Sequence, residues 1–404
     1  MRSYKILLVL TPALHPNKGG VQMTTCKLGK YFSSQGHKVA VFSFAREGHK
    51  APDEVQLHSA LEEKGAANPH NHQELAKLLG AFSPDIVINQ MPYDHSIGNT
   101  LLVNKNYLLI ACLRNTLFSV KGDIDAYLNR LVPKALRPVL RNRFGKALLL
   151  GHHRRRHRAD LERILEAYDY FVMFGPPNIE ELRYFLPDYD EEKVFLIPNS
   201  IPSVADSVPP KQNRLLWLGR VAVEQKKADL IPEIWRRLAE KLPDWELDVV
   251  GDGPFLSSLE ELVATEGLER INFHGRQQPD EFYQRSPIFF MTSAFEGFPN
   301  TLVEAQSYGS IPVVFNSYPV ASWLINESQT GFLVKPFDVD EMVKRILALA
   351  SSPHRDKLAR QVMSGAREYE IERVGLLWHE LFKEGLSRRK PATQPIKASS
   401  VDRS

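Results

Sequence analysis

The stretch Ser293–Val314, SAFEGFPNTLVEAQSYGSIPVV, carries the clearest structural pattern in the 404-residue chain. It follows the apolar run Ile288–Met291, which is typical of a parallel strand buried on both faces. Gly297 and Pro299 predict a turn, and a second apolar run, Ile311–Val314, predicts the next strand. Between turn and strand the sequence suits a short helix, so the stretch predicts one strand–helix–strand unit of an α/β sheet.

The predicted helix begins where the backbone can bind an anion. Asn300 is a suitable N-cap for a helix from Thr301 to about Tyr308. Free amide groups of Thr301 and Leu302 would then point at a phosphate, and the helix dipole would favour its negative charge. A strand, a glycine-bearing turn and a helix N-terminus together predict a phosphate site.

Two carboxylates flank this predicted site. Glu296 lies in the turn, where it can contact a group bound beyond the phosphate. Glu304 lies one turn into the helix, where it can bond vicinal hydroxyls such as those of a ribose. The alternative is an ordinary turn carboxylate and a solvated helix residue, and the phosphate context favours the functional interpretation.

Similar units continue along the chain and predict two doubly wound α/β domains. At 404 residues the chain is too long for one ordinary core, and the polar, proline-rich segment 199–213 is typical of a linker. We expect a first domain over 1–198 with a basic helical insertion near 125–165, a second domain over 214–386, and a disordered tail over 387–404. Packing of the last helix on the first domain is the expected arrangement. Ligands bind beyond the carboxyl ends of such strands, so the domains would face each other across a cleft. The expected strands are Ile6–Leu10, Val39–Phe42, Asp85–Ile88, Leu108–Cys112, Phe171–Phe174 and Val194–Ile197, then Leu215–Leu218, Leu247–Val250, Ile271–His274, Ile288–Met291 and Ile311–Val314.

Composition argues against several classes of protein. No apolar run approaches the roughly 20 residues of a membrane-spanning helix, and Ile6–Leu10 is too short for the apolar region of a signal peptide. The two cysteines, Cys26 and Cys112, imply no disulfide framework. We therefore expect a cytoplasmic protein, either free or peripheral on the inner face of the membrane.

The run from Glu296 to Glu304 resembles the Glu-x7-Glu signature of the group 1 glycosyltransferases, the fourth glycosyltransferase family. The resemblance implies the GT-B fold of two Rossmann-like domains, a nucleotide-diphosphate sugar as donor, and retention of anomeric configuration. It covers nearly all of the second domain and about the first forty residues, and thins out between about Asp53 and Glu166. Further matching segments are Lys18–Gln22 (KGGVQ), Ile197–Ser200 (IPNS), Trp217–Lys227 (WLGRVAVEQKK), Val250–Pro254 (VGDGP) and Gly331–Pro336 (GFLVKP).

The resemblance also implies roles for individual residues. Arg220 and Lys226 would neutralise the donor phosphates as the nucleotide diphosphate leaves, with Lys227 as the alternative to Lys226. Glu296 would hold hydroxyls of the donor sugar, and Glu304 would hold the ribose. The expected donor-binding residues are Gly19, Gly20, Arg220, Lys226, Arg276, Glu296, Gly297, Phe298, Asn300, Thr301, Leu302 and Glu304, and the expected catalytic residues are Glu296, Arg220, Lys226 and Arg114.

The sequence says less about the base and the acceptor. The loop His274–Arg276 lies where the family meets the base, so the Arg276 side chain is expected to stack on it. After the fourth expected strand the family often has a histidine and an asparagine, whereas this chain has Arg114 and Asn115. Arg114 would either stabilise charge at the reacting centre or anchor its loop. His95 is a further acceptor candidate, with a loop-capping role for this segment as the alternative.

No metal or other cofactor is expected. Asp123 and Asp125 fit the Asp-x-Asp pattern with which another transferase fold chelates manganese. They follow Val120–Gly122 rather than a buried strand, so loop or cap carboxylates are the better interpretation.

A basic stretch runs from Arg130 to Arg158 and ends in HHRRRHR, His152–Arg158. Three interpretations remain open. The stretch is a solvated helical face, or a surface that docks on an anionic membrane or grips a pyrophosphate-linked acceptor, or a nucleic-acid site. No known nucleic-acid-binding module accompanies the charges, so we expect no nucleic-acid partner.

Together these features predict an enzyme that moves a hexose or N-acetylhexosamine onto a glycan acceptor in the assembly of a surface polysaccharide, such as lipopolysaccharide or capsule. UDP is the expected nucleotide because of its frequency in the family, and a lipid-linked saccharide is the expected acceptor. A sugar-nucleotide epimerase of the same fold and a catalytically silent nucleotide- or glycan-binding homologue are the alternatives. The Glu-x7-Glu run argues against the first, and the presence of both cations and both carboxylates argues against the second.

Overall fold

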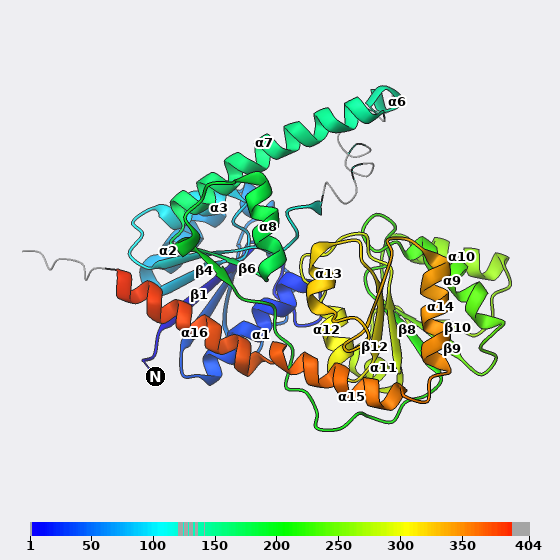
Figure 1. Ribbon diagram of the computed structural model, residues 1–404. Helices are drawn as coiled ribbons and strands as arrows, with labels where there is room; N and C mark the ends of the chain where they lie inside the picture. Colours follow the sequence, from blue (N-terminus) through cyan, green and yellow to red (C-terminus); the bar gives the residue numbers. More distant parts are fainter. Residues whose placement is uncertain are drawn as a thin grey trace, which may run out of the picture.

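The computed structural model describes residues 2–119 and 142–389 and, between these ranges, Ile124, Leu128, Val132, Pro133 and residues 136–140. The described chain forms two α/β domains that stand side by side (Figure 1). Each domain is built on one parallel sheet with helices packed against it. The predicted fold class is therefore confirmed.

The first sheet has seven parallel strands in the order β3-β2-β1-β4-β5-β6-β7. Alternate residues of a strand point to opposite faces, and in β1 both sets are fully buried. Leu7 and Val9 join the apolar cluster on one face, whereas Ile6 and Leu8 join the cluster on the other. Burial on both faces explains why such strands are continuous apolar runs. The strands are β1 (Lys5–Leu10), β2 (Lys38–Ser43), β3 (Gln56–Ser59), β4 (Ile86–Asn89), β5 (Leu108–Cys112), β6 (Tyr170–Met173) and β7 (Val194–Leu196).

The second sheet has six parallel strands in the order β10-β9-β8-β11-β12-β13. Its core includes two large indole rings, Trp217 on β8 and Trp235 on α9, that are almost completely buried. Two edge strands are not among those predicted from the sequence: β3, whose residues QLHS are largely polar, and β13. The strands are β8 (Arg214–Leu218), β9 (Glu246–Val250), β10 (Ile271–Phe273), β11 (Ile288–Met291), β12 (Ile311–Phe315) and β13 (Phe332–Val334).

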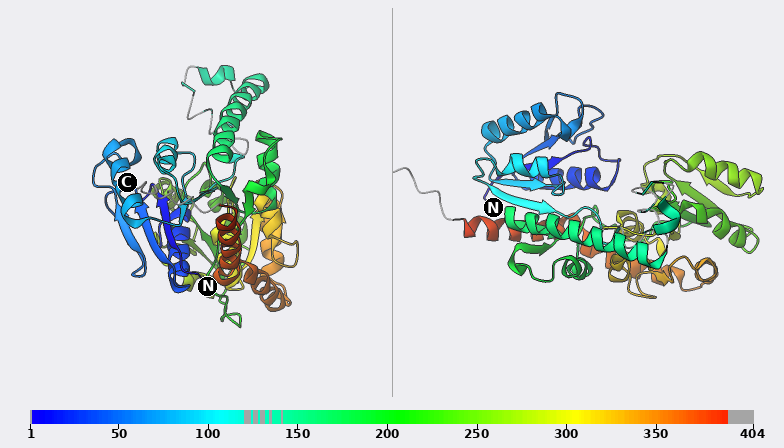
Figure 2. Two further views of the ribbon diagram at one scale, coloured as in Figure 1. Left: turned by 90° about the vertical axis from the view of Figure 1, so that its left-hand side faces the viewer. Right: turned by 90° about the horizontal axis from the view of Figure 1, so that it is seen from above.

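Helices connect the strands and cover the sheets (Figure 1). One of them, α7, extends far beyond the first sheet (Figure 2). In the first domain the helices are α1 (Gly20–Ser34), α2 (Pro69–Phe82), α3 (His95–Leu102), α6 (Arg137–Leu140), α7 (Arg143–Ala167) and α8 (Pro176–Phe185). After the linker they are α9 (Ile231–Ala239), α10 (Leu256–Thr265), α11 (Asp280–Arg285), α12 (Asn300–Ser307), α13 (Pro319–Leu324), α14 (Val339–Ala350), α15 (Arg355–Ala366) and α16 (Ile371–Arg388).

The last helix, α16, returns to the first domain. Its Trp378, Leu381 and Phe382 are buried in the apolar cluster on one face of the first sheet. The outgoing and returning segments are also joined, because the Ile201 amide donates to the Tyr369 carbonyl and the Ile371 amide to the Ile201 carbonyl. The helix ends at Arg388, so the first two residues of the expected tail are helical, and residues 390–404 lie outside the described part.

Lys211 anchors the end of the linker to the second domain. Its Nζ donates to the carbonyl oxygens of Tyr283 at 2.8 Å, Ser286 at 3.2 Å and Tyr308 at 2.8 Å. A single lysine thus contacts carbonyl groups at the C-terminal ends of both α11 and α12.

We expect Lys211→Met to lower the free energy of unfolding by about 2–4 kcal/mol, because the Tyr308 carbonyl loses its side-chain donor and the carbonyls of Tyr283 and Ser286 are left to share the single hydroxyl of Ser310. Urea unfolding followed by tryptophan fluorescence measures the change. The exposed Lys241 serves as control, and Lys241→Met should shift the free energy by less than about 0.5 kcal/mol. Equal stability of the two variants would contradict the anchoring role.

Candidate functional site

The candidate site lies where the carboxyl ends of the two sheets meet. The strand order of the first sheet reverses between β1 and β4, and that of the second between β8 and β11. Such switch points open a crevice for ligands. Loops that follow β1, β5 and β11 touch across the domains: a Cβ added to Gly297 would lie 2.7 Å from the Asn115 Cα, and one added to Gly20 would lie 3.4 Å from the Asn300 Nδ2.

Two helices begin at this junction, one from each domain (Figure 1). α1 begins at Gly20, and its N-cap Gly19 has a φ of 65°, a left-handed conformation that favours glycine. α12 begins at Asn300, and neither helix has a side-chain cap. The positive ends of two helix dipoles therefore lie close together at the junction, an arrangement that favours an anion between them.

The expected N-cap at Asn300 is wrong. Pro299 precedes the helix, and Asn300 is its first residue. The Asn300 Oδ1 instead accepts a hydrogen bond from Asn199 Nδ2 at 3.1 Å. The expected free amide of Leu302 is also wrong, because it donates to the Pro299 carbonyl at 2.9 Å. Both errors follow from a helix that starts one residue earlier than expected.

Other donors at this helix start are available to a ligand. Within the described part of the chain, no hydrogen bond uses the amide groups of Gly297, Phe298 or Thr301. The buried Oγ1 of Thr301 also has no hydrogen-bond partner among the described residues. Unpaired buried donors are costly, so their convergence indicates a place that an anionic ligand would complete.

Both predicted carboxylates are buried and each is paired with a lysine. Glu296 is 7% exposed, and its oxygens accept from Lys226 Nζ at 2.6 Å and Gln225 Nε2 at 3.3 Å. Glu304 is also 7% exposed and accepts from Lys27 Nζ at 3.0 Å and from the Tyr283 hydroxyl at 3.3 Å. Pairing of this kind offsets the cost of burying a carboxylate.

Lys27 is not among the residues expected from the sequence. It lies on α1 and therefore joins the first domain to Glu304 of the second, and it also donates to the Ser200 carbonyl at 3.3 Å. One signal could have found it. Lys27 follows Gly20 by two helical turns, so it lies on the face of α1 that starts at the glycine loop.

Further cations gather at the junction. Arg220 is exposed and has no hydrogen bond or ion pair within the described part of the chain. Arg276 reaches only to 3.8 Å from Asp252. The pKa of His15 is lowered by burial first and then by the charges of Lys18, Lys50 and Arg276, which come from both domains. A polyanionic ligand would relieve this concentration of positive charge.

A cavity of about 380 Å³ opens on the first-domain side of the junction. Arg114 lines it, donating through Nε to Gln90 and through Nη1 to Asn199 Oδ1 at 3.1 Å. The buried Nη2 of Arg114 has no partner among the described residues, and burial lowers the pKa of this guanidinium. Through Asn199 the guanidinium is connected to Asn300 at the start of α12.

The remaining acceptor candidates are placed differently. Asn115 is exposed, lines the cavity and bonds the Thr116 amide at 2.9 Å. His95 does not line the cavity, and its Nε2 lies 3.0 Å from Asp160 of α7. Asp94 caps α3 by accepting from the Ser96 amide. The structure therefore brings Asn115 together with Arg114 but leaves His95 apart.

The loop that carries Arg114 is held by a buried carboxylate that the sequence did not single out. Glu181 on α8 is fully buried and accepts from Thr116 Oγ1 at 2.5 Å and from the Leu117 amide at 2.8 Å. Nothing in the local sequence distinguishes it from an ordinary helix surface residue.

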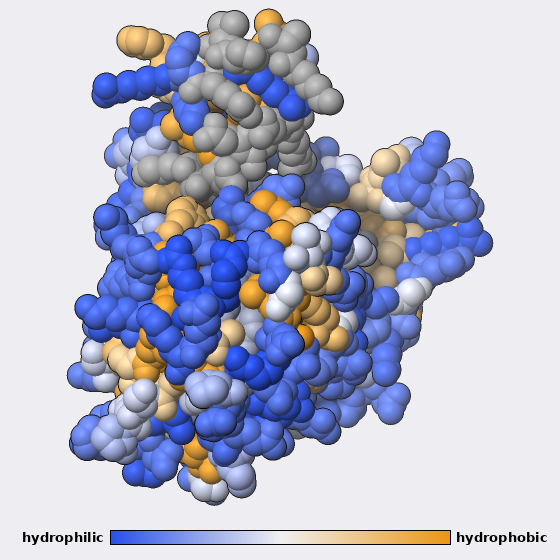
Figure 3. Space-filling view, turned by 90° about the vertical axis from the view of Figure 1, so that its right-hand side faces the viewer, coloured by the Kyte–Doolittle hydropathy of each residue, from blue (hydrophilic) through white to orange (hydrophobic). Residues whose placement is uncertain are grey.

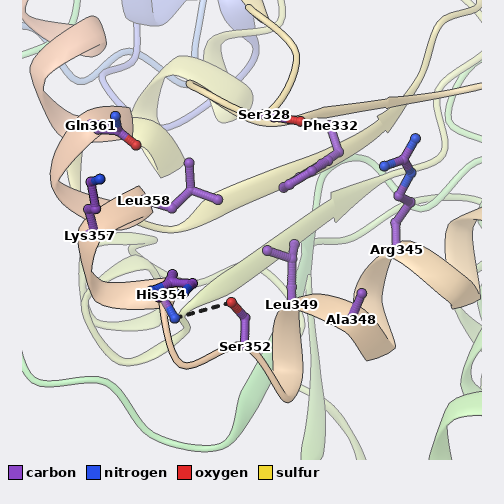
Figure 4. A pocket seen from close by; sticks show the side chains of 10 residues that line it. All are labelled: Ser328, Phe332, Arg345, Ala348, Leu349, Ser352, His354, Lys357, Leu358 and Gln361. Carbon is purple, nitrogen blue, oxygen red and sulfur yellow. Dashed lines mark hydrogen bonds between the residues drawn. The ribbon is translucent and has the colours of Figure 1, made fainter.

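A second cavity, of about 470 Å³, lies between β13, α14 and α15 (Figure 4). None of the predicted site residues lines it. Its Arg345 is 3.6 Å from both Glu327 and Glu341, so its charge is shared with carboxylates of the same domain. We therefore do not assign the chemistry to this cavity.

The Asp-x-Asp pair and part of the basic stretch cannot be placed in the described structure. Asp123 and Asp125 lie outside the described part, as do Arg130, Lys134 and Arg141. Across the described residues there is no group of three or more metal-ligating side chains that could hold an ion. No helix among them is both long and apolar enough to cross a bilayer.

Two parallel-sheet domains that meet at a junction rich in cations and in amides without partners define a doubly wound α/β class of protein with a crevice suited to an anionic ligand. Comparison with known families is more specific. Residues 204–369 match the family model of the glycosyl transferases group 1. These residues form a domain of that family, and the chain has the GT-B fold, so the predicted family and fold are confirmed.

Individual relatives agree with this assignment. The chain is 32% identical to an uncharacterized glycosyltransferase of Haemophilus influenzae over 159 residues, which are 38% of this chain and 44% of the relative. It is 26% identical to the lipopolysaccharide 1,6-galactosyltransferase of Salmonella typhimurium over 45% of this chain and 46% of the relative. The matches thus span less than half the length of these two curated relatives.

A solved structure resembles nearly the whole chain. The pneumococcal O-GlcNAc transferase GtfA in complex with UDP and GlcNAc superposes with a TM-score of 0.69, covering 95% of this chain and 100% of that one. At 12% identity this similarity concerns the fold alone.

We expect Lys27→Met to lower the free energy of unfolding by about 1–3 kcal/mol, because Glu304 loses its cation and the domains lose an ion pair. Lys30→Met, on an exposed position of the same helix, is the matched control and should have little effect. In a double-mutant cycle with Glu304→Gln, the two losses should sum to more than the loss in the double variant. Strictly additive losses would contradict a direct interaction between the two side chains.

Proposed function

We propose that the protein is a glycosyltransferase that moves a hexose or N-acetylhexosamine from a UDP-sugar to a glycan acceptor. The main support is the facing of two uncapped helix N-termini, α1 and α12, with cations from both domains around them. A nucleotide diphosphate is a ligand whose charge and length suit this junction. The UDP bound in the pneumococcal transferase of the same fold supports the choice of nucleotide.

The donor is held mainly by the second domain in this proposal. The diphosphate lies at the start of α12, where Thr301 supplies an amide and a hydroxyl without partners in the described chain. Glu304 accepts from the ribose hydroxyls, and Glu296 accepts from hydroxyls of the sugar. Both carboxylates are already fixed by lysines, so they need little reordering when the donor binds.

Departure of the nucleotide diphosphate is the step that these cations would assist. Negative charge grows on the leaving phosphate as the glycosidic bond breaks, and a positioned cation stabilises it. Arg220 is well suited because it has no partner to give up, whereas Lys226 is held by Glu296 at 2.6 Å. We propose transfer with retention. The acceptor hydroxyl attacks the anomeric carbon from the same face as the leaving phosphate, and that phosphate takes up the hydroxyl proton.

The acceptor is placed in the cavity of the first domain. Arg114, with a buried and unpartnered Nη2, lies at the inner wall, where it can bond an acceptor oxygen or the donor sugar. Because Asn199 connects it to Asn300, the acceptor wall and the donor helix share one hydrogen-bonded chain. The acceptor is proposed to be a lipid-linked saccharide of surface polysaccharide assembly, met at the cytoplasmic face, and the lipopolysaccharide galactosyltransferase among the relatives supports that class.

The proposal is tested by incubating the full chain with a panel of nucleotide sugars, with and without bacterial lipid extract. We expect UDP release that depends on added lipid extract, together with a labelled lipid product. Isomerised nucleotide sugar without any acceptor would instead indicate an epimerase. Donor binding without release under every condition would indicate a silent binding protein.

We expect Arg220→Ala to lower kcat/KM about 10²–10³-fold, because one positioned cation is lost from the leaving group. Its stability should be unchanged, since Arg220 has no intramolecular partner in the described chain. Arg360→Ala, at an exposed position of α15, is the control and should keep full activity. Steady-state UDP release measures both, and equal rates for the two variants would contradict the role.

A further inference from the structure

The N-terminal part of α7 forms an arm that stands out from the molecule. Figures 1 and 2 show the helix leaving the first domain and extending over the second, with α6 at its far end. The part of the helix near its C-terminus is buried on the first domain through Leu161, Ile164 and Leu165. Near its start, by contrast, Phe144 is 84% exposed and Leu148 is 70% exposed.

The exposed apolar residues of the arm lie on one face. Phe144, Ala147, Leu148 and Gly151 are exposed and are separated by three or four residues, the spacing of neighbours on a helix surface. Leu136, just before α6, is 53% exposed and adds to the same end of the molecule. Large apolar side chains grouped on a protruding end indicate an interaction surface, because exposing apolar area to water is unfavourable and binding would bury it.

The same arm is strongly cationic. From Arg143 to Ala159 the helix contains no acidic residue. Arg155 and Arg156 are exposed and make no ion pair or hydrogen bond within the described structure. Figure 3 shows strongly hydrophilic and apolar residues side by side on this projecting part. An apolar tip followed by unpaired cations complements the acyl boundary and the anionic head groups of a membrane.

We propose that the arm, residues 142–158, docks the protein on an anionic lipid surface. Phe144 and Leu148 enter the boundary between head groups and acyl chains, and Arg155 and Arg156 contact the anionic head groups. The charge run alone left a solvated face, a membrane surface and a nucleic-acid site open. The exposed apolar tip favours the membrane, because nucleic acid offers no comparable apolar phase.

The arm also connects this surface to the acceptor cavity. His157, on the same helix, lines the cavity beside Arg114. A saccharide carried on a lipid in the docked membrane would thus meet the cavity along α7. This inference deepens the proposed function and rests on it only for the nature of the acceptor, not for the binding of lipid.

Vesicle binding by the full chain tests the proposal. Co-sedimentation is measured with vesicles of phosphatidylcholine and phosphatidylglycerol (three to one) and with pure phosphatidylcholine, at low and moderate salt. We expect binding to the anionic vesicles, weakened by salt and much weaker on the neutral ones. The double variant Phe144→Ser/Leu148→Ser should lose on the order of 100-fold in affinity, and Arg155→Glu/Arg156→Glu on the order of 10-fold or more.

A matched control separates the arm from general surface hydrophobicity. Leu61→Ser/Val103→Ser removes two apolar side chains that are 61% and 66% exposed elsewhere on the first domain, and it should bind like the wild type. Equal binding by the Phe144→Ser/Leu148→Ser variant and the wild type would overturn the proposal. So would absence of wild-type binding, binding to DNA but not to vesicles, or a wild-type dimer that this variant dissolves.

Transfer in detergent distinguishes this inference from the proposed function. With a detergent-dispersed lipid extract, the Phe144→Ser/Leu148→Ser variant should transfer sugar as fast as the wild type. If the wild type transferred sugar in detergent but did not bind vesicles, the proposed docking surface would be wrong and the proposed function would stand. Vesicle binding without transfer under any condition would do the reverse.

Discussion

A carboxylate that is nearly excluded from water must be paired, and that constraint organises the junction between the two domains. Glu304 satisfies it with Lys27, which belongs to the other domain, and Glu296 satisfies it with Lys226. The first pair holds α1 against α12 and so brings two helix N-termini to one place. The concentration of unpartnered amides and cations there follows from this arrangement, and such a place favours an anion.

The two sides of the junction differ in how far their groups are satisfied. On the second domain the carboxylates are paired, while Arg220 and the groups of Thr301 remain available. On the first domain Arg114, which lines the cavity, is held through two of its nitrogens, and the third is buried without a hydrogen-bond partner among the described residues. The loop that positions it depends on Glu181, which is fully buried. The proposed donor side thus offers groups without partners at the start of α12, and the proposed acceptor side offers one guanidinium in the wall of a cavity.

The sequence predicts most of the fold, because strands such as β1 and β11 are buried on both faces and appear as unbroken apolar runs. It misses β3, since the edge of a sheet tolerates the polar residues QLHS. The expected cap at Asn300 fails for a local reason: Pro299 already occupies the position before the helix. Lys27 and Glu181 were missed for another reason, because their partners are distant in sequence and no local pattern encodes such pairs.

A structure of the protein with a bound UDP-sugar tests the central claim most directly. The account predicts the diphosphate between the starts of α1 and α12, with a phosphate oxygen within hydrogen-bond distance of the Thr301 amide and the ribose hydroxyls on Glu304. Arg220 should turn towards the phosphate that leaves with the nucleotide. A diphosphate bound elsewhere, for instance in the cavity beside Arg345, or a ribose that does not touch Glu304, would contradict it.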